Sequence, residues 1–122
     1  MAFDAINMVD VIEIMENYIS KNRPPKEIRQ ELDLNYRTDK QSIVLFEIRP
    51  HWDDKTKFRE HDFAKATFDK KNNVWKIYWL RASLKWISYE PKPTVKKLSD
   101  FLKQVDKDEY GCFRGLQVGC LK

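Results

Sequence analysis

The spacing of hydrophobic residues changes along the chain from a helical period to a strand period and back. Between Asp4 and about Lys21, apolar residues recur three or four positions apart, which predicts an amphipathic helix. The segment "KNRPP" ends this helix, because proline cannot donate the backbone amide that a helix requires. Pro25 can begin a second, short helix through "KEIRQEL". Residues 1–31 are therefore expected to form a helical N-terminal segment.

A period of two then predicts β-strands, with polar or turn-forming residues between them. Five strands are expected, at residues 32–37, 43–50, 63–68, 74–81 and 84–89. The segment "HWDDKTKFREHD" (51–62) is expected to be a polar loop. Because short turns join most of these strands, residues 32–89 are expected to form an antiparallel meander.

A helical period returns over residues 94–107, where Thr94 can cap the first turn. The glycine-containing tail, residues 108–122, is expected to be irregular. The length favours one domain spanning residues 1–122. The order of elements predicts an α+β fold in which the N-terminal helices and one C-terminal helix pack on one face of the sheet.

Alternation along the strands also predicts which side chains share a face. One apolar set is expected to face the helices: Val44, Phe46, Phe68, Trp75, Ile77 and Trp79. Trp86 is left undetermined, because the inward side of its strand is ambiguous. The opposite face is expected to carry Arg37, Arg49, Lys65, Lys76, Tyr78 and Lys85. Asp33 and Glu47 dilute the positive charge there, and scattered apolar residues lie among it: Phe63, Leu80, Ile87 and Tyr89.

The charge is unevenly distributed, and this changes the picture of that second face. The formal net charge of the chain is +4. Residues 1–64 have a net charge of −3, residues 65–97 have +7, and residues 98–122 are balanced. A concentrated positive segment rich in aromatic residues favours an anionic partner.

Cations beside a flat ring on an exposed sheet suit a nucleic-acid strand, because phosphates pair with Lys and Arg while bases stack on the ring. The sequence therefore predicts a nucleic-acid or anion-binding surface made of Arg37, Arg49, Lys65, Lys76, Tyr78 and Lys85. Two alternatives stay open. The residues can be ordinary strand packing and solvation, or the face can bind a protein, either an acidic partner or a second copy in a homodimer.

Catalytic motifs are not evident in the sequence. There is no GxSxG, no phosphate loop and no GxGxxG, and the whole chain has three glycines. Asp33, Glu47 and Arg49 give a faint echo of a metal-dependent nuclease, and alternation places all three on one side of the first hairpin. Arg49 cannot act as a general base, and cross-strand ion pairs are the simpler interpretation. A non-catalytic binding domain without a cofactor is expected, with a metal-dependent hydrolase as the alternative.

The remaining candidate ligands do not follow a metal-binding spacing. His51, Asp53, Asp54, Glu60, His61 and Asp62 crowd the polar loop. Neither histidine pairs at helical spacing and no acidic run has calcium-loop spacing, so a solvated loop without a metal is expected. Cys112 and Cys120 form no CxxC pair, and two reduced thiols are expected.

No apolar run is long enough to span a bilayer, and the N-terminus lacks a basic leader. A soluble cytoplasmic protein without a membrane partner is expected.

Three segments, "FEIRPHW" (46–52), "FAK" (63–65) and "WKIYWLRASLKWISY" (75–89), together resemble a bacterial domain-of-unknown-function family, number 3024. The resemblance covers Glu47, Arg49, Pro50, Trp52, Ala64, Lys65, Trp75, Tyr78, Trp79, Trp86 and Tyr89. Ile87 departs from it, because members often have histidine there, so no proton-transfer role is carried over. The family has no established activity, so the resemblance implies a coherent fold and no particular function.

Overall fold

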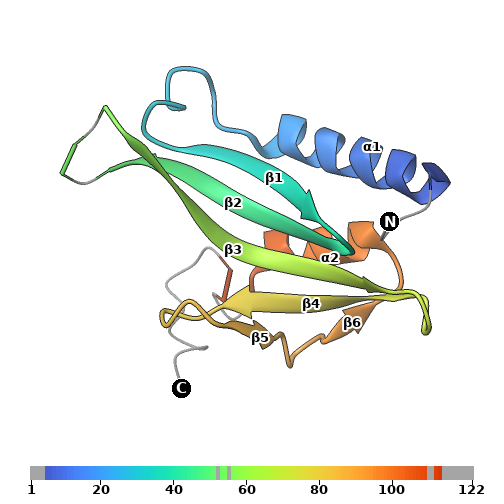
Figure 1. Cartoon of the computed structure of the whole chain (residues 1–122). Coiled ribbons are helices and arrows are strands. Elements are labelled where there is room, and N and C mark those ends of the chain that lie inside the picture. Colours follow the sequence, from blue (N-terminus) through green and yellow to red (C-terminus); the bar gives the residue numbers. More distant parts are fainter. Residues whose placement is uncertain (1–4, 52, 55, 110–111, 114–122) are drawn as a thin grey trace.

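Figure 1 shows the fold as a computed structural model, which describes residues 5–51, 53–54, 56–109 and 112–113. In chain order the elements are α1 (Ala5–Asn22), β1 (Asp33–Asp39), β2 (Ser42–Pro50), β3 (Phe58–Asp69), β4 (Val74–Leu80), β5 (Trp86–Ser88), β6 (Thr94–Val95) and α2 (Leu98–Lys107). The strands form one antiparallel sheet in the order β1-β2-β3-β4-β5, and β6 also pairs with β4. The expected α+β fold is confirmed.

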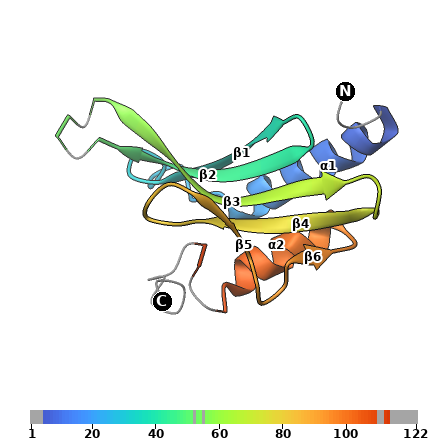
Figure 2. The same cartoon turned by 60° about the horizontal axis from the view of Figure 1, so that its bottom comes forward.

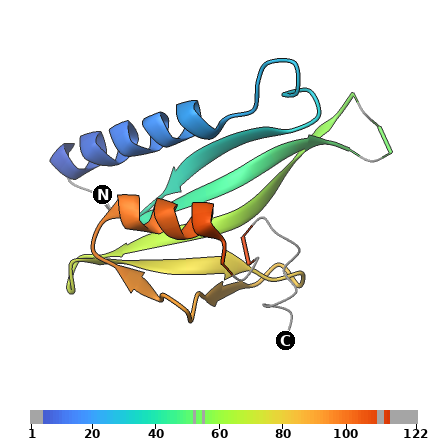
Figure 3. The same ribbon diagram turned by 180° about the vertical axis from the view of Figure 1, so that it is seen from behind.

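Both helices lie on the same face of the sheet, which is turned away from the viewer in Figure 1 and toward the viewer in Figure 3. α1 buries Val11, Met15 and Tyr18, which recur at helical spacing and so form one stripe. α2 buries a matching stripe of four apolar side chains: Leu98, Phe101, Leu102 and Val105. We call the sheet face under these helices the inner face and the opposite face the outer face.

The inner face follows the expected alternation in β3 and β4. Trp75, Ile77 and Trp79 are buried there, as predicted. Their partners in β3 are Phe68, Ala66 and Ala64, and the two alanines are completely buried. Small side chains at the centre of the sheet leave room for the bulky rings and for the helix layer above them.

The predicted orientation of the side chains of β2 is wrong, because the residues that face the helices are shifted by one position. Val44 is paired with Arg37 on one side and with Lys65 on the other, so Val44 and Phe46 point to the outer face. Ile43 and Leu45 take the inner face instead and are completely buried. Because four consecutive residues of this strand are apolar, alternation alone did not decide which pair faced the helices.

A bulge in β3 explains a second difference. Leu45 pairs with Ala64 but Phe46 pairs with Asp62, so Phe63 is an extra residue without a partner in β2. Phe63 therefore turns into the core, where it is 6% exposed, rather than lying on the outer face. Tyr89 is also in the core, and Ile87 packs against the core. Both were expected on the outer face, and neither lies there.

Several element boundaries differ from the prediction. Residues 26–31 form successive turns instead of a short helix, and the apolar side chain of Ile28 in this segment is 44% exposed rather than packed on the core. Thr94 does not cap the last helix; it belongs to β6, and α2 begins at Leu98 after Lys97. Hydrogen bonding of residues 94–95 to β4 uses the backbone groups that a longer helix would have needed.

The segment expected to be a polar loop is partly strand. β3 begins at Phe58, and its residues 58–62 pair with β2 only, because the pairing of β3 with β4 begins at Ala64. The ends of β2 and β3 consequently extend past the rest of the sheet as a two-stranded arm, clearest in Figure 2. Phe58 on this arm is 55% exposed.

Two backbone amides at the β1 edge of the sheet are occupied by side chains of the same strand. The amide of Leu34 donates to Asp33 Oδ1 and the amide of Tyr36 donates to Asn35 Oδ1, each at 2.8 Å. These amides would otherwise be open to another chain. Arg23, just after α1, donates two hydrogen bonds of 2.7 Å to Asp33 and so fixes the start of β1.

Two further expectations concern the C-terminal segment and the membrane. Cys112 is buried and disulfide-bonded, so the reduced thiol expected there is wrong; Cys120 lies outside the described residues. Within the described ranges, no helix is both long and apolar enough to cross a bilayer. A cytoplasmic location stays a prediction.

The pairing predicts how the centre of the sheet tolerates added volume. Ala66→Leu should lower the free energy of unfolding by about 1–3 kcal/mol, because the inner face has no space for three more carbons. The neighbouring Thr67→Val loses only one hydroxyl contact, to Ser42, and should cost less than about 1 kcal/mol. Urea unfolding of both variants measures the difference, and equal effects would contradict the assignment of faces.

A second prediction concerns acid unfolding. The hydrogen-bonded guanidinium of Arg23 holds the pKa of Asp33 below its ordinary value. A lowered pKa stabilises the folded protein above the unfolded pKa of about 3.9, and this stabilisation is lost as the pH falls through the folded pKa. Asp33→Asn should therefore be less stable than the wild type near neutral pH, with a difference that shrinks below about pH 4. A difference that stays constant in urea unfolding across this range would rule out the linkage.

Candidate nucleic-acid interface

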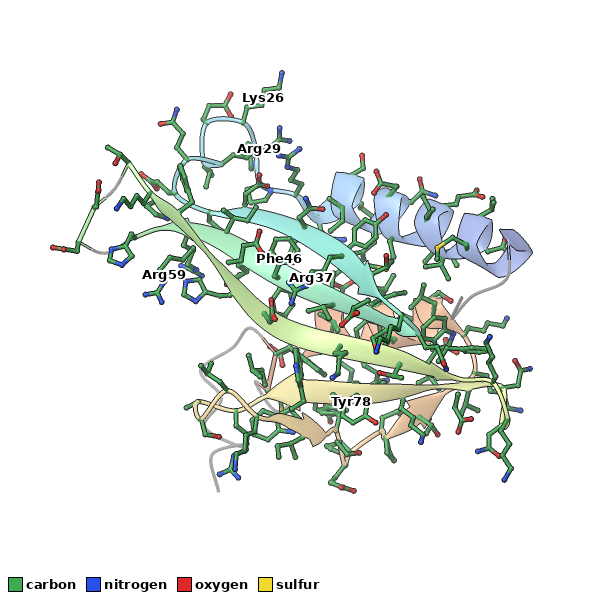
Figure 4. All side chains as sticks on the ribbon, viewed as in Figure 1. Lys26, Arg29, Arg37, Phe46, Arg59 and Tyr78 are labelled. Atoms are coloured by element: carbon green, nitrogen blue, oxygen red, sulfur yellow. The ribbon has the colours of Figure 1, made fainter. Side chains whose placement is uncertain are left out.

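The outer face has one continuous row of side chains running across five strands. Arg37, Val44, Lys65, Tyr78 and Ser88 stand directly opposite one another in β1 to β5. Neither helix covers this row, and Figure 4 shows Arg37, Phe46 and Tyr78 on the side facing the viewer. The row therefore places two cations and an aromatic ring on the side of the sheet opposite the helices.

Lys65 is at the centre of this row, between two aromatic rings. Its Nζ lies 5.1 Å from the ring centroid of Tyr78 and 4.8 Å from that of Trp86. Both distances are typical of cation–π contacts, in which the ring face attracts the ammonium. Partial burial lowers the pKa of Lys65, opposed by the negative charges of Asp39 and Asp62. The ammonium has thus lost part of its hydration, and an incoming anion can replace that lost solvation.

Arg37 is held more firmly than Lys65. It donates two hydrogen bonds, of 2.8 and 2.6 Å, to the carboxylate of Asp62. Its guanidinium also lies 5.4 Å from the ring centroid of Phe46. Arg37 therefore shields an apolar ring on the outer face, and much of its charge is compensated within the protein.

Lys76 lies on the same face, two residues before Tyr78 in β4. Its side chain is 48% exposed, and its Nζ is 3.8 Å from Asp69. Hydrogen bonds from Asn72 hold the pKa of Asp69 below its ordinary value, so this carboxylate stays charged. Lys76 is therefore a half-exposed cation, loosely paired with Asp69, at the edge of the row.

Two predicted site residues are not part of this surface. Arg49 lies on the inner side of the sheet with Glu47, to which it donates a hydrogen bond of 3.0 Å. The predicted face of Arg49 was wrong for the same reason as that of Val44, because a shift of one residue in β2 reverses the face of every side chain in the strand. Lys85 lies in the turn between β4 and β5, outside the row. The structure thus brings together Arg37, Lys65, Lys76 and Tyr78 of the six.

The nuclease-like arrangement is contradicted by the strand register. Asp33 is paired with Ile48 and points to the outer side, whereas Glu47 is paired with Leu34 and points to the inner side. Asp33 is bonded to Arg23 instead. In the part of the chain that the structure describes, no three His, Cys, Asp or Glu side chains are grouped so as to hold a metal ion.

Trp86 and a group of lysines are the site residues that sequence reasoning missed. Trp86 is paired with Leu80, which places it on the outer face beside Lys65. Its side was ambiguous because the length of the β4–β5 turn could not be read from the sequence. Lys92, Lys96 and Lys103 line a groove between β6 and α2. The +7 charge of residues 65–97 signalled two of these lysines, but β6 was not foreseen.

Residues 3–115 match the family described as "Domain of unknown function (DUF3024)". The chain belongs to the DUF3024 family. No curated protein and no solved structure matches it. In this DUF3024 chain, the residues that carry the resemblance divide between two faces of the sheet: Glu47 and Arg49 lie on the inner face, and Lys65, Tyr78 and Trp86 lie on the outer face. The family description assigns no activity, so the geometry of the outer face carries the functional argument.

Proposed function

We propose that this domain is a non-catalytic binding module whose outer face binds single-stranded nucleic acid. The observation that supports this most directly is the ammonium of Lys65 between the rings of Tyr78 and Trp86, on the face opposite the helices. Phosphates of the strand pair with Arg37, Lys65 and Lys76, and bases stack on the two rings. Flat rings accept any base, so little sequence preference is expected.

The ion pairs on the outer face limit how much electrostatic attraction contributes to the affinity for a nucleic-acid strand. Arg37 is compensated by Asp62 and Lys76 is partly compensated by Asp69. A phosphate must compete with these carboxylates, while the carboxylates of the face repel it. Binding should therefore combine a few phosphate contacts with base stacking, and a ligand without bases should bind more weakly than a single strand.

Binding to an oligothymidylate should fall with rising salt, because pairing of lysines with phosphates releases counterions. Three phosphate contacts, by Arg37, Lys65 and Lys76, correspond to a slope of about −2 in a plot of log affinity against log salt. Lys76→Glu should weaken binding and leave the unfolding curve unchanged, since its side chain is half exposed. Fluorescence anisotropy at several salt concentrations measures both quantities.

Lys21→Glu is the matched control, because it makes the same charge change at an exposed position in the last turn of α1. It should alter affinity much less than Lys76→Glu does. Binding that is independent of salt, or that is reduced equally by both variants, would contradict the proposed surface.

Stacking can be separated from charge by removing the rings. Tyr78→Ala and Trp86→Ala should each weaken binding by about 1–3 kcal/mol with a nearly unchanged salt slope. Lys65→Met keeps the aliphatic stem between the rings and should instead reduce the slope by about 0.7. Phe58→Ala is the control, because Phe58 is an exposed ring on the arm, outside the row. If Phe58→Ala weakened binding as much as the two ring variants, the assignment of the rings would be wrong.

The other partners expected from the sequence stay predictions. An acidic protein or a second copy of the chain on the outer face would be seen as a larger species in sizing experiments. Bacterial origin and a cytoplasmic location agree with a nucleic-acid ligand, but the proposal does not depend on them.

A further inference from the structure

A groove of about 530 Å³ lies between β6 and α2, at the side of the sheet opposite β1. Three lysines from separate segments line it: Lys92 before β6, Lys96 after β6, and Lys103 in α2. Figure 2 shows β6 and α2 next to each other. The fold thus brings three ammonium groups to one concave surface.

Beside these three lysines, the lining of the groove contains one carboxylate, that of Asp100. Asp100 lies 4.0 Å from the ammonium of Lys103, one turn away on α2. In the described part of the chain, neither Lys92 nor Lys96 makes an ion pair. The lysines of the groove therefore have an excess of positive charge, unlike Arg37 on the outer face. Like charges held together repel one another, and an anion in the groove relieves that repulsion.

The groove also adjoins the outer face through the sheet. Thr94, which lines the groove, is paired directly with Lys76 of β4. Neighbouring strands lie about 4.8 Å apart, so Lys76 and the groove are adjacent. β6 lies beside β4 at this edge of the sheet (Figure 1), so a strand that crosses the row at Lys65 and Tyr78 and passes Lys76 would continue toward Lys92 and Lys96, which flank β6.

We propose that the β6–α2 groove binds consecutive phosphate groups of the same single strand that the outer face binds. This inference rests on the proposed function and names a second part of its site. The row on the outer face supplies the aromatic contacts, and the groove supplies uncompensated charge for the backbone. A ligand long enough to reach both parts gains the two sets of contacts at once.

Inorganic tripolyphosphate is a second kind of ligand that could occupy the groove, because it also presents consecutive phosphates but has no sugars or bases. Two probes therefore separate the sources: a long oligothymidylate and tripolyphosphate. A short oligothymidylate, which covers the row alone, is the length control.

The test variant is Lys96→Gln combined with Lys103→Gln, which removes two charges of the groove and retains the side-chain size. The expected result is a salt slope smaller by about 1.4 for the long oligothymidylate, since each single-strand phosphate contact contributes about 0.7. The short oligothymidylate should bind the variant and the wild type alike. Lys107→Gln is the control, because Lys107 is in the last turn of α2 and 3.6 Å from Glu109, outside the groove.

The outcomes distinguish the two proposals. An unchanged slope in the double variant, with binding still dependent on Tyr78, overturns the groove and leaves the outer face intact. If the wild type binds tripolyphosphate through Lys96 and Lys103 but binds neither oligothymidylate, the groove is a polyphosphate site and the proposed function fails. A wild type that binds none of the three probes overturns both.

Discussion

Burial of one face of the sheet under α1 and α2 determines where every other side chain can lie. Ile43, Ala66 and Ile77 are completely buried in one row beneath the helices. Since side chains alternate along a strand, fixing this row also fixes its neighbours on the opposite face. Arg37, Lys65 and Tyr78 point outward because the residues beside them are needed inside. The candidate site is in this sense a consequence of the core.

The outer face is not simply a solvated surface, because it covers a thin apolar layer of its own. Val44 and Phe46 are 4% and 5% exposed although no helix lies over them. The guanidinium of Arg37 lies over Phe46, and Lys65 stands directly beside Val44 in the ladder. The long aliphatic stems of such residues can cover apolar neighbours while their charged ends reach water. The same side chains thus contribute to stability and to the proposed interface.

The sequence was sufficient for the architecture where one face of an element was clearly apolar and the other polar. α1, α2 and β4 are of this kind, and Trp75 and Trp79 were placed correctly. In β2, four successive apolar residues made both assignments equally consistent, so Val44, Phe46 and Arg49 were placed on the wrong sides. The bulge at Phe63 and the strand β6 depend on pairing with distant segments, which local patterns do not encode.

The existing partners of the cations on the outer face bear on what kind of anion it can bind. Arg37 has Asp62, Lys76 has Asp69, and Lys65 has two rings, so each exchanges an internal contact for a phosphate. Such an exchange yields little net free energy, because a surface ion pair contributes only about 0–1 kcal/mol. A single phosphate group should therefore bind poorly. A single strand gains counterion release at several positions and also stacks its bases on Tyr78 and Trp86, and these contributions add along the strand. An extended strand with bases is thus the anion that fits this face best.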